Sequence, residues 1–184
     1  MRLCLTSVGG VLAMSVSVEL ENLLSKQAIT EAIYRYCRSM DRIDVELGYS
    51  VWHEDAIADY GAVFSGTGKG FIDWVSDFHR GIVSHHHQVS NILITVEKNN
   101  AISESYVTVA LFLNDSEKGL MQVRGRGRYL DKWSFKDNRW AIDKRQFVLD
   151  FATIAPAVEE TPRWGKRDKT DPSYLLSNVM KIGV

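Results

Sequence analysis

The apolar residues of this chain change their spacing once, near residue 85. Before that point they recur at three- and four-residue steps over residues 20–37 and 71–83, which is typical of one buried face of a helix. After it they alternate with polar residues, as in half-buried strands. We expect strands at residues 85–96, 101–113, 120–135 and 140–151, a short strand at 56–60 and a short helix at 44–51. Helices followed by a meander of long strands predict an α+β fold, in which N-terminal helices cover a cone-shaped, curved antiparallel sheet.

The 184 residues are expected to form one domain with short flanking segments. Residues 1–18 are interpreted as an N-terminal extension, because a single arginine, Arg2, makes a poor secretory signal. Residues 19–151 form the α+β domain. Residues 152–184 contain the chain's three prolines and are expected to be a C-terminal tail that packs across the body, a neighbouring subunit or the mouth of a pocket.

Composition excludes several classes of function. The formal net charge of −1 and the lack of a long basic run argue against nucleic-acid binding. No stretch is long and apolar enough to suggest a membrane protein. The two cysteines, Cys4 and Cys37, fit neither a disulfide framework nor a zinc site, which favours a reduced, cytoplasmic location.

Asp41 lies where the first helix should end, one turn beyond Cys37 on the apolar face. A carboxylate on that face is costly unless a partner pairs with it. Two interpretations remain open. Asp41 could cap the next short helix, a role that Asp44 could also fill, or it could be a buried group that orients a histidine. Tyr36, five residues earlier, reaches the same region.

Three consecutive histidines begin the first long strand. Because neighbouring side chains of a strand point to opposite faces, His85 and His87 share one face and His86 takes the other. At most two of them could meet one ion, so we expect no metal site. A histidine that faces an aspartate in a pocket is a candidate general base, because imidazole has a pKa of about 6.5. His53 and His79 are weaker candidates, expected to be solvated.

Other catalytic patterns are missing from the sequence. No serine lies in a strand–turn–helix elbow, and Cys37 is expected to be a small packing residue. Gly125 and Gly127 lie inside a strand, where they indicate bending or a close approach rather than a nucleotide fingerprint. An enzyme with this sequence would therefore use acid–base chemistry without a cofactor, on a small molecule held inside the cone.

Several motifs resemble the SnoaL-like branch of the nuclear transport factor 2-like superfamily. The resemblance covers residues 20–151. The motifs are Tyr34-Arg-Tyr36, Met40-Asp-Arg-Ile-Asp44, Trp52-His-Glu-Asp-Ala56, Asp59-Tyr-Gly61, His87-Gln-Val-Ser-Asn91, Gly127-Arg-Tyr-Leu-Asp131 and Trp140-Ala-Ile-Asp-Lys-Arg145. They match the first helix and the histidine strand of that branch, as well as its last two strands.

The branch includes cofactor-independent lyases, namely scytalone dehydratase, hexachlorocyclohexane dehydrochlorinase and bile-acid 7α-dehydratase, which share an Asp–His dyad. The resemblance places this dyad on Asp41 and His87, with Tyr36 and Arg145 as further catalytic residues. The substrate-binding residues that we expect beside them are Tyr60, Tyr129, Asn91, Trp52 and His85. Tyr36 replaces a lysine of the dehydrochlorinase, and Gly127 and Tyr129 replace a serine and an asparagine of scytalone dehydratase. These departures argue against their substrates.

We therefore expect a cofactor-independent lyase of the dehydratase type, acting on a small hydrophobic or aromatic substrate. One alternative is a retro-aldol, deformylating lyase acting on a lignin-derived aromatic. Another is a non-catalytic protein of the same fold, such as an oxygenase small subunit or a ligand-binding protein. An isomerase of the ketosteroid type is disfavoured, because its base is an aspartate on the sheet. Exposed apolar outer strands predict a homodimer or homotrimer.

Overall fold

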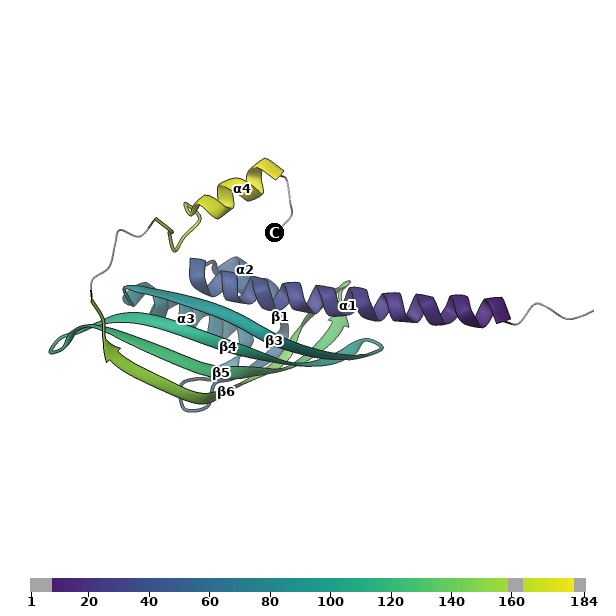
Figure 1. Cartoon of the computed structure of the whole chain (residues 1–184), viewed down its shortest axis with the longest axis horizontal. Helices are drawn as coiled ribbons and strands as arrows, with labels where there is room; N and C mark the ends of the chain where they lie inside the picture. Colours follow the sequence, from purple (N-terminus) through teal and green to yellow (C-terminus); the bar gives the residue numbers. More distant parts are fainter. Residues whose placement is uncertain (1–7, 159–163, 181–184) are drawn as a thin grey trace, which may run out of the picture.

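The structure is a computed structural model that describes residues 8–158 and 164–180 (Figure 1). Arg2 and Cys4, on which part of the expectation for the N-terminal extension rests, lie outside these ranges. The elements in chain order are α1 (Val8–Arg42), α2 (Val45–Ser50), β1 (Trp52–Asp59), β2 (Ser65–Thr67), α3 (Gly68–Gly81), β3 (Ser84–Glu97), β4 (Asn100–Asp115), β5 (Gly119–Lys136), β6 (Arg139–Pro156) and α4 (Pro172–Met180).

The strands form one curved sheet in the order β2-β1-β6-β5-β4-β3. The long strands β3 to β6 pair antiparallel as a meander, as the sequence predicts. The expectation of a wholly antiparallel sheet is wrong at one place, because β1 pairs with β6 in parallel. The whole meander separates these two strands in sequence, so no hairpin fixes their relative direction. The result is an α+β cone with a mixed sheet.

Bulges and one glycine allow the sheet to curve. The register shifts between Ser90 and Leu93, and between Arg126 and Gly127 on β5. Extra residues of this kind bend a strand and increase its twist. A Cβ atom on Gly127 would lie 2.3 Å from the carbonyl oxygen of Val148 on β6. The close approach at Gly127 is thus to the neighbouring strand β6, whereas the sequence suggested a helix or a ligand as its partner.

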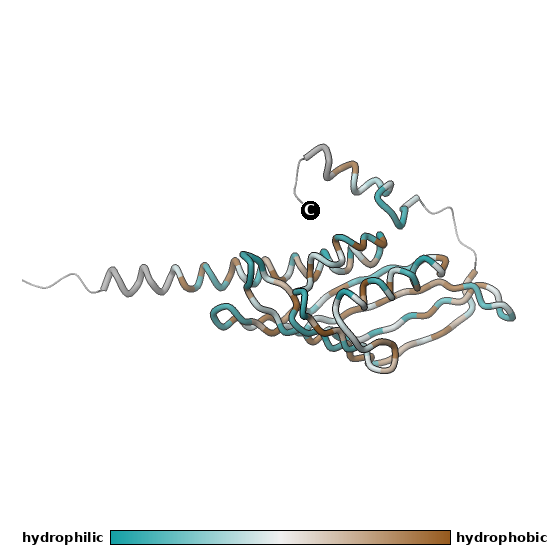
Figure 2. The backbone as a smooth tube through the Cα atoms, turned by 180° about the vertical axis from the view of Figure 1, so that it is seen from behind, coloured by the Kyte–Doolittle hydropathy of each residue, from teal (hydrophilic) through white to brown (hydrophobic). Residues whose placement is uncertain are grey.

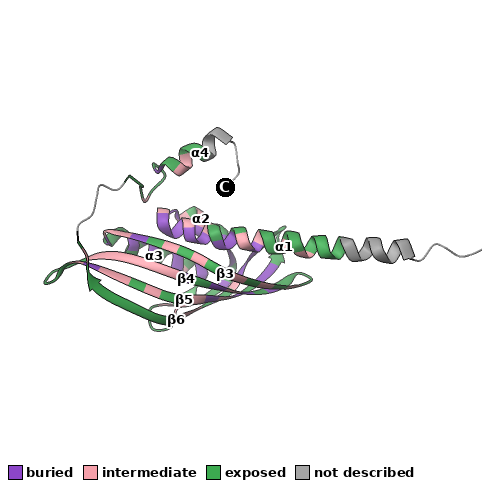
Figure 3. Ribbon diagram, viewed as in Figure 1, coloured by how far each residue is buried: buried purple, intermediate pink, exposed green. Residues whose placement is uncertain are grey.

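The helices cover one face of the curved sheet, with α1 against β3 and β6 and α3 against β1 and β2 (Figure 1). The core between them is apolar and largely aromatic. Buried side chains lie on the C-terminal half of α1 and across the sheet beneath it (Figure 3). Ile33 and Met40 of α1, Ile72 of α3, and Trp133 and Ile142 of the sheet are almost fully buried.

The first helix is longer than its packing partner. It begins at Val8, within the segment expected to be an extension, and projects beyond the sheet (Figure 1). Hydrophobic residues continue along the projecting part (Figure 2). The sequence predicted Leu20, Leu23 and Leu24 on the core face, but all three are more than half exposed. The helix is thus present as predicted, but the described residues do not cover these three leucines.

The C-terminal tail returns to the body. Strand β6 runs on to Pro156, and residues 164–176 and α4 lie over the end of α1 and over α2 (Figure 1). Tyr174 of α4 donates a hydrogen bond to Asp44 with a distance of 2.7 Å. None of the helices within residues 8–158 and 164–180 has the length and hydrophobicity needed to cross a membrane.

Candidate active site

The end of α1 resolves the two interpretations of Asp41. Asp44 is the N-cap of α2, where its side chain accepts a hydrogen bond from the backbone N–H of Leu47 at 3.2 Å. Asp41 lies one turn earlier and does not cap that helix. Its carboxylate is directed toward β3 instead, and the residue is only 8% exposed. A buried carboxylate is stable only where donors satisfy it, and β3 supplies them.

Asp41 and His87 are in direct contact. Nδ1 of His87 lies 2.7 Å from one carboxylate oxygen of Asp41, and the backbone N–H of His87 donates to both oxygens at 3.0 and 3.1 Å. A carboxylate accepts, so Nδ1 carries the proton and Nε2 carries the lone pair. No described residue forms a hydrogen bond with Nε2. The arrangement holds an imidazole in the tautomer that a general base needs.

Both ring nitrogens of His85 form hydrogen bonds within the protein. Nε2 donates to the backbone carbonyl of Met40 at 2.7 Å, and Nδ1 accepts from Arg167 at 3.3 Å. Burial lowers the pKa of His85 to about 4, and the hydrogen bond to Met40 opposes that shift only in part. This placement does not support the expected substrate-binding role. His86 is exposed on the opposite face, as strand alternation predicts.

Two further histidines differ from expectation because both are buried. His79 stacks on His85 with ring centroids 3.9 Å apart and is 3% exposed. Burial is the main cause that lowers the pKa of His79 to about 2, and the neighbouring His85 further disfavours a proton there. His53 is also buried, with Nε2 3.1 Å from the carbonyl oxygen of Ser134. The imidazole of His79 therefore packs in the neutral form.

A second polar cluster surrounds Arg145, which is fully buried. Its guanidinium donates two hydrogen bonds to the carboxylate of Asp131, at 2.7 and 2.8 Å. The rings of Tyr36 and Tyr129 lie on it, with centroids 4.1 and 4.0 Å from the guanidinium carbon. Burial alone would lower the pKa of Arg145, but the Asp131 carboxylate outweighs it and raises that pKa well above its usual range.

Three tyrosines line this cluster as neutral phenols. The hydroxyls of Tyr36 and Tyr60 are 2.7 Å apart, and Tyr60 stacks on Phe71 with centroids 3.9 Å apart. Burial raises the pKa of Tyr36, Tyr60 and Tyr129 well above the usual value. Trp52 packs edge-on against Tyr36. These predicted site residues therefore lie together as an aromatic cluster of hydrogen-bond donors.

Cys37 lies between the two clusters. Burial raises the pKa of its thiol to about 12, while Arg145 lowers it and Asp41 raises it, so both charges act on this one side chain. The thiol stays protonated, in agreement with its expected packing role. Asn91 is different, because it is exposed at the bulge of β3 with a backbone φ of 49°. Its placement does not support a substrate-binding role.

Two hollows lie on either side of Asp41. One, of about 460 Å³, is lined by His87 and Asp41 together with Cys37 and the arginines along α1. The other, of about 500 Å³, is lined by Asp41 and His85 and is closed on one side by residues 164–167 of the tail. The mouth of a pocket was one of the three places that the sequence suggested for the tail, although the sequence did not single out these residues or Asp41 as their neighbour. Among the described residues, no group of three histidine, cysteine or acidic side chains is arranged to hold a metal ion.

A curved sheet covered on one face by helices is the nuclear transport factor 2-like α+β cone. The SnoaL-like domain family matches residues 21–146, and the chain belongs to that family. The family expected from the sequence motifs is therefore confirmed.

Solved structures share the fold at low sequence identity. Hexachlorocyclohexane dehydrochlorinase LinA-type3 from Novosphingobium barchaimii LL02 has a TM-score of 0.66 and 17% identity, covering 79% of this chain and 99% of that chain. A candidate scytalone dehydratase from Novosphingobium aromaticivorans DSM 12444 has a TM-score of 0.63 and 20% identity, covering 77% and 93%. The protein Kfla4162 from Kribbella flavida has a TM-score of 0.62 and 14% identity, covering 71% and 93%. The comparison with curated proteins finds no match.

Proposed function

We propose that this protein is a cofactor-independent lyase that removes water from a small hydrophobic or aromatic substrate, with Asp41 and His87 as the catalytic pair. The observation that carries the proposal is the 2.7 Å contact between Nδ1 of His87 and Asp41, with Nε2 free of any described partner. The names of two structural neighbours, a dehydrochlorinase and a candidate dehydratase, support an elimination.

In this mechanism Nε2 of His87 takes a proton from a carbon next to the one that bears the hydroxyl group. The electron pair of the broken C–H bond forms the double bond, the C–O bond breaks, and the hydroxyl leaves as water after it gains a proton. Asp41 fixes the tautomer of His87 and stabilises the imidazolium that forms. Positioned acid–base catalysis of this kind contributes about a hundred- to ten-thousand-fold.

The aromatic cluster would polarise the substrate or assist the leaving group. Tyr36 and Tyr60 keep their phenolic protons, because burial raises both pKa values far above neutrality. Nη1 of Arg145 is buried and has no hydrogen-bond partner among the described residues, so it can donate to a carbonyl oxygen. Tyr129 and Trp52 would supply the apolar walls that an aromatic substrate requires.

The same base supports a second candidate, a carbon–carbon lyase. If His87 takes a proton from a primary hydroxyl group instead of from carbon, the C–C bond to that CH2O unit breaks and formaldehyde leaves by a retro-aldol step. The electron pair of the broken bond stays on the other carbon, which takes the proton back from the His87 imidazolium. The two candidates differ in product, which is water in one and formaldehyde in the other. A non-catalytic small subunit would have no need for the Asp41–His87 contact, and so that alternative is the weaker one.

A panel of aromatic alcohols and enols, followed by absorbance and by formaldehyde detection, tests the proposal. We expect His87→Ala to lower turnover on an accepted substrate by about a hundred-fold or more. His86→Ala is the matched control, since it removes a neighbouring imidazole from the opposite, exposed face. Equal turnover of His87→Ala and the wild-type protein would end the mechanism.

The proposal extends to location and assembly. Cys37 is buried as a free thiol, which supports a reduced compartment, and we propose the cytoplasm. Exposed apolar residues on β6 and on the projecting part of α1 support a homodimer or homotrimer.

A further inference from the structure

Arg167 of the C-terminal tail joins two elements of the body beside the candidate catalytic pair. Its guanidinium donates to the backbone carbonyls of His79 and Ile82, at 2.6 and 2.9 Å, where α3 ends. It also donates to Nδ1 of His85 on β3, at 3.3 Å. Three acceptors from separate positions therefore fix one planar donor group, which suits the rigid fork of an arginine.

The contact with Arg167 determines the tautomer of His85. Arginine has only donors, so Nδ1 of His85 must present its lone pair. The proton then resides on Nε2, which donates to the carbonyl oxygen of Met40 at 2.7 Å. Met40 directly precedes Asp41 in the last turn of α1. A continuous path of hydrogen bonds thus connects the tail to the backbone that carries the catalytic carboxylate.

We propose that Arg167 is a positioning residue for the Asp41–His87 pair, acting through His85 and the Met40 carbonyl, so that the C-terminal tail is part of the active site. This inference rests on the proposed function, in which Asp41 orients His87. Through the contacts with His79, Ile82 and His85, Arg167 would act by holding the end of α1 against β3. A displacement of about 1 Å at a catalytic group is enough to cost about a hundred-fold in rate.

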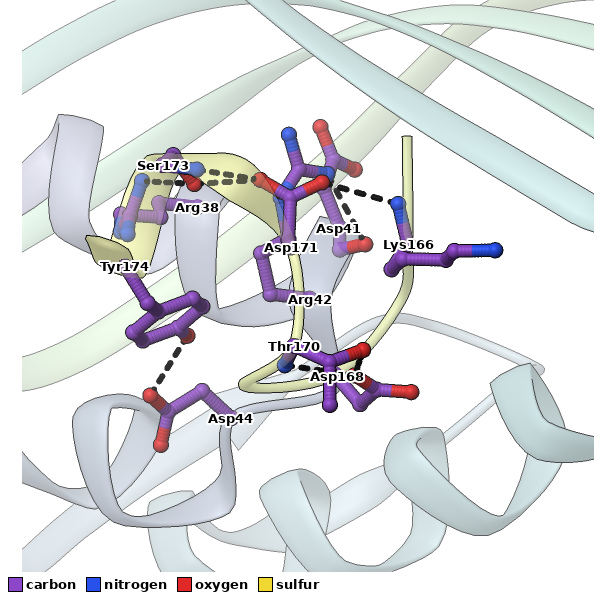
Figure 4. A network of polar contacts seen from close by, with 10 residues as sticks. All are labelled: Arg38, Asp41, Arg42, Asp44, Lys166, Asp168, Thr170, Asp171, Ser173 and Tyr174. Atoms are coloured by element: carbon purple, nitrogen blue, oxygen red, sulfur yellow. Dashed lines mark hydrogen bonds and ion pairs between the residues drawn. The ribbon is translucent and has the colours of Figure 1, made fainter. Parts of the chain in front are cut away.

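The loop that presents Arg167 is itself closed by Asp171 (Figure 4). The Asp171 side chain accepts from the backbone N–H of Lys166 at 2.8 Å and from that of Ser173 at 3.0 Å, which ties residues 166 and 173 together. Arg42, next to Asp41 on α1, lies 3.3 Å from the same carboxylate. The tail therefore holds the last turn of α1 by two routes, through Asp171 and through Arg167.

Four titratable or charged groups surround His85: His79 of α3, His87 of the same strand, Asp41 of α1 and Arg167 of the tail. Arg167 disfavours a proton on Nδ1 of His85, and so does burial. Removal of the Arg167 charge should raise the pKa of His85 and allow both neutral tautomers. In the other tautomer Nε2 of His85 could not donate to the Met40 carbonyl oxygen, so the backbone next to Asp41 would be held less firmly.

Nuclear magnetic resonance of the imidazole nitrogens tests this inference without a substrate. In the wild-type protein we expect His85 as the Nε2–H tautomer alone and His87 as the Nδ1–H tautomer. Arg167→Gln should give mixed tautomers for His85, a higher pKa for His85 and altered nitrogen signals for His87. Arg167→Lys keeps the positive charge but loses the planar guanidinium, so the His85 signals should change less than in Arg167→Gln. It replaces the glutamine variant in the test if that variant does not fold.

Lys169→Gln is the matched control, because it removes one positive charge from the same tail at a side chain that is 69% exposed. On an accepted substrate, Arg167→Gln should lower kcat about ten-fold with little change in KM, and Lys169→Gln should leave both unchanged. Nitrogen signals of His85 and His87 in Arg167→Gln that match the wild-type protein would overturn the inference. The lyase proposal has a separate test, because unchanged turnover of His87→Ala would contradict it. Failure of one proposal can therefore be told from failure of the other.

Discussion

At the scale of single residues, the buried pair of Arg145 and Asp131 supports the fold and the candidate site at once. Both side chains are fully buried, and the pair has two hydrogen bonds of 2.7 and 2.8 Å. Burial of both ions carries a desolvation cost that their attraction offsets only while both are present. Loss of activity on mutation of Arg145 therefore does not by itself assign a catalytic role, and stability must be measured beside it.

We expect Arg145→Leu to lower the free energy of unfolding by about 3–5 kcal/mol, because the Asp131 carboxylate is left buried and unpaired. Urea unfolding followed by tryptophan fluorescence measures the loss. The double variant Arg145→Leu/Asp131→Leu is the control and should recover much of the lost stability. If the double variant is as unstable as the single one, the unpaired carboxylate is not the cause.

The contact of Asp41 with His87 could be predicted because periodicity put Asp41 on a buried face and His85 and His87 on one strand face, and the resemblance to SnoaL-like lyases then selected His87. The buried face of α3 was predicted less accurately. The apolar repeat of residues 71–83 predicts Phe78 on the core side, but Phe78 is 42% exposed, whereas His79 is 3% exposed. The buried stripe of α3 continues from Ile72 and Val75 through Ser76 to His79, and hydrophobicity alone misses its polar members.

At the scale of elements, β5 and β6 lie so close at one point that only glycine fits. A Cβ on Gly127 would lie 2.3 Å from the Val148 carbonyl oxygen and 2.8 Å from the ring of Phe147. Backbone cannot give way as a flexible side chain does. Gly125, two residues earlier on β5, would bring its Cβ no closer than 3.7 Å to Leu149, which is ordinary contact.

Gly127→Ala should therefore lower the free energy of unfolding by about 1–3 kcal/mol through overpacking. Gly125→Ala is the matched control in the same strand, and its stability should stay close to that of the wild-type protein. Chemical denaturation of both variants under one set of conditions provides the comparison. Equal midpoints for the two variants would contradict the steric explanation.

The strands of the meander could be predicted from their alternation, but their ends and one pairing could not. The last strand was expected to stop at residue 151 and continues to Pro156, because its pairing with β5 persists after the hydrophobic alternation becomes irregular. The parallel pairing of β1 with β6 joins segments about ninety residues apart, and no turn between them encodes it.

At the scale of the whole molecule, the buried histidines make stability depend on pH. His79 and His85 have folded-state pKa values lowered to about 2 and about 4, below the value near 6.5 of an unfolded chain. Below pH 6.5 the unfolded state therefore binds more protons than the folded state, and stability falls as the pH drops from 6.5 toward 4.

The expected loss is at most about 1.4 kcal/mol per pH unit for each imidazole. Urea midpoints measured at pH 7 and pH 5 test it, and His85→Gln should reduce the pH dependence by removing one of the two groups. His86→Ala, at an exposed position, should leave the pH dependence unchanged. A wild-type midpoint that is the same at both pH values would refute the neutral burial of His79 and His85.

Exposed apolar residues at the surface bear on whether copies of the chain assemble. The end of β6 exposes Leu149, Phe151 and Ile154, each by more than half, on strands that are already paired within the sheet. The pairing register puts Leu149 and Ile154 on one face of the sheet and Phe151 on the other. Isolated apolar residues are ordinary at a protein surface, but three of them at one strand end indicate that another subunit covers this end. We expect a homo-oligomer in sedimentation velocity, and we expect Phe151→Lys to shift it toward the monomer because it would place a charge inside the contact. Leu23→Lys, on the projecting part of α1, separates the two exposed surfaces: if it dissociates the assembly and Phe151→Lys does not, the helix is the interface and the prediction for β6 is wrong.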